Sequence, residues 1–148
     1  LARLAPEADL AEAVHEPAYF FKPSSGTVRP VEAFRGMRAA AVSGIGCPDS
    51  FHSLLRLSGI DLVHSFAFPD HHRFSERDFN AVREVLRNEN AREVIITEKD
   101  FFRCPDLWAR SFDPWILRIR IRFRAGEMKL WETLEALTAP GPGEKVYA

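Results

Sequence analysis

The sequence predicts an α/β protein with an open, mostly parallel sheet that is flanked by helices. Two short, almost continuous apolar runs, 38–43 and 93–97, have the composition of strands that are buried on both faces. Segments with the start and stop signals of helices lie between the apolar runs. Strands and helices therefore alternate along the chain, which is typical of an open sheet with right-handed crossover connections.

The first clear helix follows the glycine-containing segment after the strand at 38–43. Pro48 suits the first turn of a helix, and Gly59 is a good C-terminal stop. Residues 60–68 include Leu62, Val63, Phe66 and Phe68 and are expected to form the next strand. Ser75 and Asp78 then form the Ser-x-x-acid pattern of a capping box, which predicts a helix that runs to about residue 90.

The C-terminal part of the chain continues the alternation after the strand at 93–97. A short helix is expected around 101–108, and 115–123 alternates strictly between apolar residues and arginine, as a strand does. The last helix is predicted over 127–137, where the spacing of Met128, Trp131 and Leu134 indicates a face that packs in the core.

The residues before Gly36 show weaker signals. A short helix can include Leu4, Leu10, Ala13 and Val14, and 18–21 can form a strand. We expect an irregular segment over 1–35 that continues from a missing upstream half, an α/β domain over 36–139 and a flexible tail over 140–148. The chain begins at Leu1 rather than at a methionine, which favours a fragment or a separated domain.

Composition excludes several classes of protein. The 148 residues fit one ordinary domain, and the formal net charge of -1 gives no global attraction to nucleic acid or to an acidic membrane. The two cysteines, Cys47 and Cys104, match no zinc spacing and are typical of reduced cytosolic thiols. No stretch approaches the ~18 apolar residues of a membrane span, and a signal peptide is not expected.

Polar clusters follow three of the predicted strands: Gly44-Ile45-Gly46-Cys47, Asp70-His71-His72 and Thr97-Glu98-Lys99-Asp100. Ligands in open α/β sheets bind beyond the carboxyl ends of the strands, so the three clusters are expected to converge on one site. Gly44 and Gly46 can present backbone N–H groups to an anion, although a tight turn that lets strand and helix pack closely is the favoured interpretation. The phosphate-binding pattern Gly-x-x-x-x-Gly-Lys-Ser/Thr is absent from this sequence.

Asp70, His71 and His72 offer a carboxylate that can orient an imidazole for proton transfer. The alternative is a polar turn in which His72 is solvated and Asp70 caps the local backbone. His15, His52 and His64 do not belong to such a polar cluster and are expected to be surface or packing residues.

The segment 97–100 also has two interpretations. Lys99 can bind a phosphate or a carbonyl, and the carboxylates of Glu98 and Asp100 can bind a hydroxyl or Mg²⁺. Alternatively, the segment is a helix N-terminus in which Thr97 or Asp100 caps the helix. The arginines of 118–122 can contact lipid phosphates, but a solvated face or the charged guard of an edge strand is favoured.

The order and separation of these clusters resemble the C-terminal half of the tetraacyldisaccharide 4'-kinases of bacterial lipid A synthesis. The resemblance covers roughly 35–137 and depends on Gly-Ile-Gly-x-Pro at 44–48, Phe-Pro-Asp-His-His-x-Phe at 68–74 and Ile-Thr-Glu-Lys-Asp-x-x-x-Cys at 96–104. It implies the C-terminal half of a P-loop-type kinase fold. That family transfers the γ-phosphate of ATP, with Mg²⁺, to the 4'-hydroxyl of a tetraacylated disaccharide 1-phosphate at the cytoplasmic face of the inner membrane.

The resemblance also implies roles for individual residues. His71, with Asp70 beside it, is expected to support a catalytic carboxylate from the N-terminal half. Thr97, Glu98, Lys99, Asp100, Gly44 and Gly46 are the expected cofactor-binding residues, and no metal ligand is expected in this chain. The family's phosphate-binding loop, catalytic aspartates and membrane-associating segment lie upstream, so we expect this chain alone to be inactive and soluble.

Two alternatives stay open at this point. Asp70-His71-His72 is also similar to the motif of the Asp-His-His phosphoesterases, which binds Mn²⁺. The chain could instead be a non-catalytic module that binds a nucleotide or another anion at the strand ends.

Overall fold

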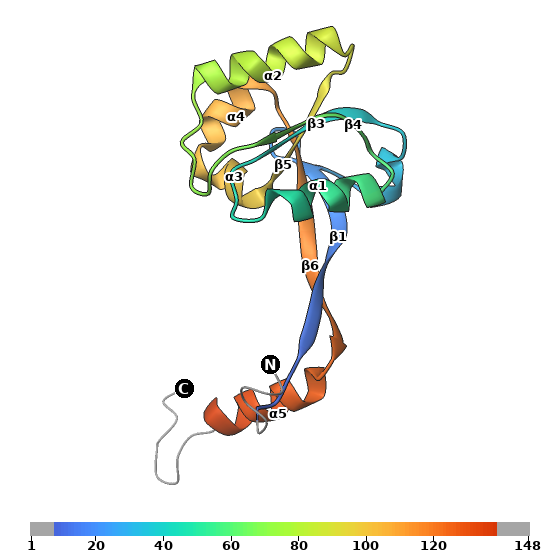
Figure 1. The fold of residues 1–148 in the computed structure, drawn as a ribbon, viewed down its shortest axis with the longest axis vertical. Helices are drawn as coiled ribbons and strands as arrows, with labels where there is room; N and C mark the ends of the chain where they lie inside the picture. The colour runs from blue at the N-terminus through green and yellow to red at the C-terminus, as the bar shows by residue number, and fades with distance from the viewer. Residues whose placement is uncertain (1–7, 139–148) are drawn as a thin grey trace. The chain divides into compact units, whose positions relative to one another are not determined.

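The computed structural model describes residues 8–138 of the chain (Figure 1). The described chain divides into two compact units. The larger unit is Glu16–Arg120, and the smaller unit contains residues 8–15 and 121–138.

Six strands of the described chain form one sheet in the order β2-β1-β6-β5-β3-β4. Their bounds are Glu12–Lys22 (β1), Thr27–Arg29 (β2), Arg38–Ser43 (β3), Asp61–Ala67 (β4), Glu93–Thr97 (β5) and Trp115–Ala125 (β6). The strands β6, β5, β3 and β4 pair in parallel, whereas β1 and β2 pair antiparallel. This arrangement confirms the predicted open, mostly parallel α/β sheet.

Helices cover both faces of the sheet in the larger unit (Figure 1). Their bounds are Val31–Phe34 (the 3-10 helix η1), Pro48–Leu57 (α1), Glu76–Asn88 (α2), Glu98–Arg103 (α3) and Pro105–Ser111 (α4). Pro48 occupies the first turn of α1, and Gly59 follows α1 with a φ of +84° that suits glycine. The predicted capping box of α2 is confirmed, because the Ser75 side chain accepts from Asp78 N–H and the Asp78 carboxylate accepts from Ser75 N–H.

Alternate residues of the central strands pack into two separate cores, as expected for strands that are buried on both faces. One core lies toward α2 and α4 and includes Ala40, Val42, Val94, Ile96, Phe79 and Trp108. The other lies toward α1 and includes Ala39, Ala41, Ile95, Phe51 and Leu55. This double burial explains why β3 and β5 read as continuous apolar runs.

Two local expectations need correction. The helix expected to include Ala13 and Val14 is wrong, because both residues lie in β1, which also contains the expected strand at 18–21. Contacts distant in sequence favour the strand: the Phe20 ring is 4.0 Å from that of Phe34 (centroid to centroid), and Phe34 in turn contacts Trp115. The helix expected around 101–108 is two helices, because the residue before Pro105 has an extended φ of -153° that ends α3.

The arginines of β6 do not guard an edge, because β6 lies between β1 and β5. Arg118 pairs with Glu98 at the start of α3, and Arg120 pairs with Glu16 of β1 at 3.4 Å. Both arginine side chains are substantially exposed, so the solvated-face interpretation describes them better than the edge-strand one.

The smaller unit contains α5, Glu127–Thr138, whose apolar face differs from the expectation. Met128, Trp131 and Leu134 are 76%, 51% and 39% exposed, so the prediction that they are core residues is wrong for the described chain. Helical spacing identifies an apolar face, but it does not show what covers that face.

Some expectations lie outside the described residues or stay predictions. Leu4 and the tail at 140–148 are outside the described range, and the division at residues 35 and 139 stays a proposal. None of the helices within 8–138 has the length and apolar character needed to cross a membrane.

Candidate functional site

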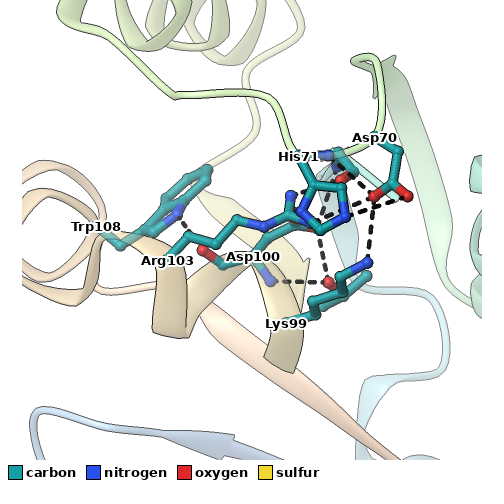
Figure 2. Close-up of polar contacts among 8 residues, drawn as sticks. Asp70, His71, Lys99, Asp100, Arg103 and Trp108 are labelled. Atoms are coloured by element: carbon teal, nitrogen blue, oxygen red, sulfur yellow. Dashed lines mark hydrogen bonds and ion pairs between the residues drawn. The ribbon is translucent and has the colours of Figure 1, made fainter. Parts of the chain in front are cut away.

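The polar clusters that follow β3, β4 and β5 meet at one edge of the sheet. These strands are neighbours and run in parallel, so their carboxyl ends lie together. Asp70 Oδ1 lies 3.2 Å from Lys99 Nζ and 3.3 Å from Arg103 Nη2 (Figure 2). The structure therefore confirms that the Asp-His cluster and the 97–100 segment share one place on the molecule.

His71 sits at the tip of the turn that follows β4. Its φ of 61° lies in the left-handed region, which is uncommon for a residue other than glycine. The Asp70 side chain accepts a hydrogen bond from His71 N–H at 2.9 Å, so Asp70 does cap the local backbone. The His71 side chain is 75% exposed, and its Nε2 is 3.7 Å from Asp70 Oδ2. The turn thus presents an accessible imidazole beside a carboxylate.

The charge of Asp70 is stabilised by its neighbours. The hydrogen bond from Lys99 is the main reason that the pKa of Asp70 is lowered, and the His71 N–H lowers this pKa further. Asp70 therefore stays a carboxylate at neutral pH, flanked by the cationic groups of Lys99 and Arg103.

Asp100 is fully buried and connects three segments. Its carboxylate accepts hydrogen bonds from Gly44 N–H at 3.1 Å, from the Thr97 hydroxyl at 2.6 Å and from Arg103 Nη1 at 3.0 Å. Thr97 also caps α3 by accepting from Asp100 N–H at 3.1 Å. Thr97 and Asp100 therefore act as the helix N-terminus interpretation describes, and Asp100 in addition ties α3 to the end of β3.

The other two members of the 97–100 segment point to different partners. Glu98 forms its ion pair with Arg118 of β6, whereas Lys99 reaches Asp70. Within this segment only Lys99 combines an exposed charged group with contact to the Asp70–His71 turn.

Gly44 is required for close packing. A Cβ atom at this position would lie 3.3 Å from Asp100 Oδ1, 3.3 Å from the Cβ of His72 and 3.4 Å from Arg103 Nη1. The N–H of Gly44 is taken by Asp100, so this amide is not free for an anion while that bond is made. Gly46 has more space, since the nearest atom to its Cβ position is Asp70 Oδ2 at 3.6 Å. The tight-turn interpretation fits Gly44.

His72 is not the solvated residue that the polar-turn alternative expected. Its ring stacks on Phe68 with centroids 4.5 Å apart, and its Nε2 lies 3.1 Å from Asp78 Oδ2. Partial burial acts to raise the pKa of Asp78, but hydrogen bonds from Ser75 and His72 outweigh it and lower this pKa. His72 therefore anchors the turn to the start of α2.

His52 is a packing residue, as expected. It is buried in α1, and its Nε2 lies 3.1 Å from the hydroxyl of Ser43 at the end of β3. Burial is the main cause of the lowered pKa of His52, and the positive charge of Arg56 adds to it.

Arg103 is the site residue that the sequence analysis missed. Its guanidinium group donates to the carbonyl oxygen of Gly44 and to the carboxylates of Asp100 and Asp70, and it lies 3.5 Å from His71 Nδ1 (Figure 2). The available signal was a basic residue three positions after Asp100 on one helix, where the two side chains are neighbours.

The arrangement offers an exposed imidazole, a fixed carboxylate and two cationic side chains. Within residues 8–138, no three His, Cys, Asp or Glu side chains are grouped so that they could hold a metal ion.

Comparisons with known proteins show the family to which the chain belongs. The model of the family described as "Tetraacyldisaccharide-1-P 4'-kinase" matches residues 4–139. A tetraacyldisaccharide 4'-kinase of Anaeromyxobacter sp. is 38% identical over 74% of this chain and 29% of its own length. One of Methylobacterium radiotolerans is 34% identical over 76% of this chain and 34% of its own length. The chain thus spans about a third of these relatives.

A solved structure shares the fold. It is described as the "apo" form of LpxK from Aquifex aeolicus in complex with ATP, and it matches with a TM-score of 0.50 and 18% identity over 92% of this chain and 40% of that one. The family match covers nearly the whole chain and includes all three strand-end clusters. The chain therefore belongs to the tetraacyldisaccharide 4'-kinase family.

Proposed function

We propose that this chain supplies the C-terminal part of the catalytic site of an ATP-dependent lipid kinase. The reaction would transfer the γ-phosphate of ATP to the 4'-hydroxyl of a tetraacylated disaccharide 1-phosphate in lipid A synthesis. One observation carries the proposal: the Asp70–His71 turn meets Lys99 and Arg103 at the carboxyl edge of the parallel strands. Family membership supplies the chemistry for that geometry.

In this proposal His71 supports a catalytic carboxylate that the upstream part of the kinase contributes. Phosphoryl transfer depends mainly on positioning and on electrostatic stabilisation, so a histidine that orients the base has a direct effect on rate. The exposure of the His71 imidazole supports the role, because the ring is free to meet a second group. Asp70 would hold the histidine in place through its bond to His71 N–H.

ATP and Mg²⁺ would bind mainly through the upstream part of the full-length enzyme. Bound Mg²⁺ would neutralise charge that develops on the phosphates. In this chain Lys99 is the member of the proposed cofactor-binding set best placed to meet a phosphate oxygen. Thr97, Asp100 and Gly44 would contribute by keeping the strand ends in place, and Glu98 and Gly46 remain proposed cofactor-binding residues.

The exposed apolar face of α5 supports the proposal that the chain works as part of a longer protein. Met128 and Trp131 lie about one turn apart on this helix and are 76% and 51% exposed, and large apolar side chains that are exposed side by side often mark a contact surface. The curated relatives are about three times as long as the matched segment. We therefore propose that the chain alone is inactive and that association with the inner membrane depends on the upstream part.

A chimeric enzyme tests the function directly. Residues 4–139 would replace the matching part of the Anaeromyxobacter relative, and transfer of labelled phosphate from ATP to the disaccharide lipid would be measured. We expect activity from the chimera and none from the 148-residue chain alone. His71→Ala should lower kcat by about 10²-fold or more, the lower range for general acid–base assistance. His64→Ala, which changes an exposed histidine of β4, is the matched control.

The result distinguishes the proposed kinase from the alternatives. A folded but inactive chimera would contradict the proposed function. A His71→Ala chimera with normal turnover would contradict the role of His71. Tight binding of ATP to the isolated chain by calorimetry, without activity in the chimera, would favour an anion-binding module. Stoichiometric Mn²⁺ in the purified chain would favour the Asp-His-His phosphoesterase.

A further inference from the structure

Arg103 contacts each of the three segments that form the strand-end site. It reaches the carbonyl oxygen of Gly44 after β3, Asp70 and His71 after β4, and Asp100 after β5. We propose that Arg103 is a positioning residue that holds the imidazole of His71 in its working orientation. This inference rests on the proposed function for its effect on rate, but its structural part can be tested without any kinase activity.

The guanidinium group of Arg103 is itself firmly held. Nη1 donates to the carbonyl oxygen of Gly44 and to the fully buried carboxylate of Asp100, and the arginine side chain is only 19% exposed. Charge-assisted hydrogen bonds to a buried carboxylate are stronger than neutral ones. The residues that follow β3 and β5, Gly44 and Asp100, therefore fix the orientation of the guanidinium group.

The other nitrogen of Arg103 acts on the turn. Nη2 donates to Asp70 Oδ1 at 3.3 Å, and the same oxygen accepts from Lys99 at 3.2 Å and from His71 N–H at 2.9 Å. A left-handed conformation is strained at a residue with a Cβ, so it persists only where other contacts impose it. Asp70 imposes it on His71, and Arg103 fixes Asp70.

Arg103 also acts on the imidazole directly. Its Nη2 lies 3.5 Å from His71 Nδ1, and arginine has donors but no acceptor. His71 Nδ1 must therefore be the acceptor in this contact, and the proton of the neutral ring then sits on Nε2. That tautomer can donate from Nε2 to a carboxylate, as the proposed role of His71 requires.

Lysine at this position could not reproduce the arrangement. An ammonium group is a single point of charge on a flexible stem, whereas the guanidinium presents a rigid fork. Nη1 and Nη2 of Arg103 bond to separate sets of acceptors, so the single ammonium group of a lysine could keep the contacts of only one of these two nitrogens. Arg103→Lys should therefore recover only part of what Arg103→Gln loses.

The first experiment uses the 148-residue chain and nitrogen-15 NMR. Arg103→Gln should shift the backbone amide signal of His71, speed its hydrogen exchange and change the ring nitrogen shifts of His71, while signals from α2 stay in place. Arg110→Gln is the matched control, because within residues 8–138 the one hydrogen bond of the Arg110 side chain goes to the carbonyl oxygen of Asp106 in its own helix. Unchanged His71 signals in the folded Arg103→Gln chain would overturn the inference.

The second experiment uses the chimeric kinase described above. Misplacing a catalytic group by about 1 Å can cost ~10²-fold, so Arg103→Gln should lower kcat by about 10- to 100-fold with little change in KM for ATP. In a His71→Ala background the same change should have almost no further effect, since Arg103 acts through His71. Independent, multiplicative losses would overturn the positioning role. If the unsubstituted chimera is inactive, the proposed function fails and the NMR result alone decides the inference.

Discussion

Replacing Asp100 with asparagine changes the charge at the centre of the strand-end site while keeping the side chain's shape. One carboxylate oxygen accepts from Gly44 N–H and from the Thr97 hydroxyl, and the other accepts from Arg103. An asparagine has only one acceptor oxygen, so its NH₂ group must face one of these donors. The most favourable placement keeps the oxygen toward Gly44 and leaves the NH₂ group facing Arg103.

The size of the effect follows from these contacts. A hydrogen bond to a charged group contributes about 1.5–3 kcal/mol, and breaking a fully buried ion pair costs about 3–5 kcal/mol. Arg103 is partly exposed and keeps its bonds to Gly44 and Asp70, which reduces the loss. We expect Asp100→Asn to lower the free energy of unfolding by about 2–4 kcal/mol.

Urea denaturation at pH 7, followed by tryptophan fluorescence, measures this change. Trp108 is a suitable probe, because its indole N–H donates to the carbonyl oxygen of Asp100 at 3.2 Å. Asp61→Asn is the control: Asp61 pairs with Arg38 on the surface, where an ion pair contributes about 0–1 kcal/mol. If the two variants were equally stable, the reasoning that Asp100 is a buried, charge-bearing junction would be refuted.

Three further predictions concern the larger unit. Acidification from pH 7 to pH 5.5 should lower the free energy of unfolding, because the pKa of His52 is lowered in the folded state and the unfolded chain therefore binds the proton more readily. In denaturation curves measured across this pH range, His52→Gln should remove the part of the pH dependence that comes from this histidine. Phe79→Ala should cost about 3–5 kcal/mol in the same assay, whereas the exposed Phe102→Ala should cost almost nothing. Gly44→Ala should lower the melting temperature, because its Cβ crowds three neighbours, and Gly46→Ala should leave it unchanged within a degree or so; equal effects would contradict the close-packing role of Gly44.

Local patterns in the sequence predicted the elements that depend on local physics. The capping box at Ser75 and Asp78 and the proline at the start of α1 satisfy backbone groups within one turn of a helix, so residues three or four positions apart identify them. The apolar runs of β3 and β5 predicted double burial, because the interior residues 39–42 and 94–96 are all apolar and polar residues stand only at the strand ends. These signals were sufficient for the fold class.

The elements that the sequence analysis missed depend on distant contacts. Val14 lies in a strand because β1 joins the sheet next to β6, a pairing with residues about a hundred positions later. The apolar spacing of α5 predicted a face that packs in the core, yet Trp131 is 51% exposed. The prediction was wrong because helical spacing shows which residues share a face, but not what lies against that face.

The candidate site shows the same division between sequence and structure. The sequence by itself determined the family. It also predicted the three strand-end clusters and His71 as a candidate catalytic residue, because a parallel sheet brings the ends of its strands to one edge. Only the tertiary structure decided which contacts each residue makes. Asp100 is buried and bonds to Gly44, Lys99 reaches Asp70, and Arg103 contacts the segments that follow β3, β4 and β5. Asp70 and Arg103 are separated by 33 positions, and their contact follows from the order of β4, β3 and β5 in the sheet and from the turn geometry, neither of which a local pattern encodes.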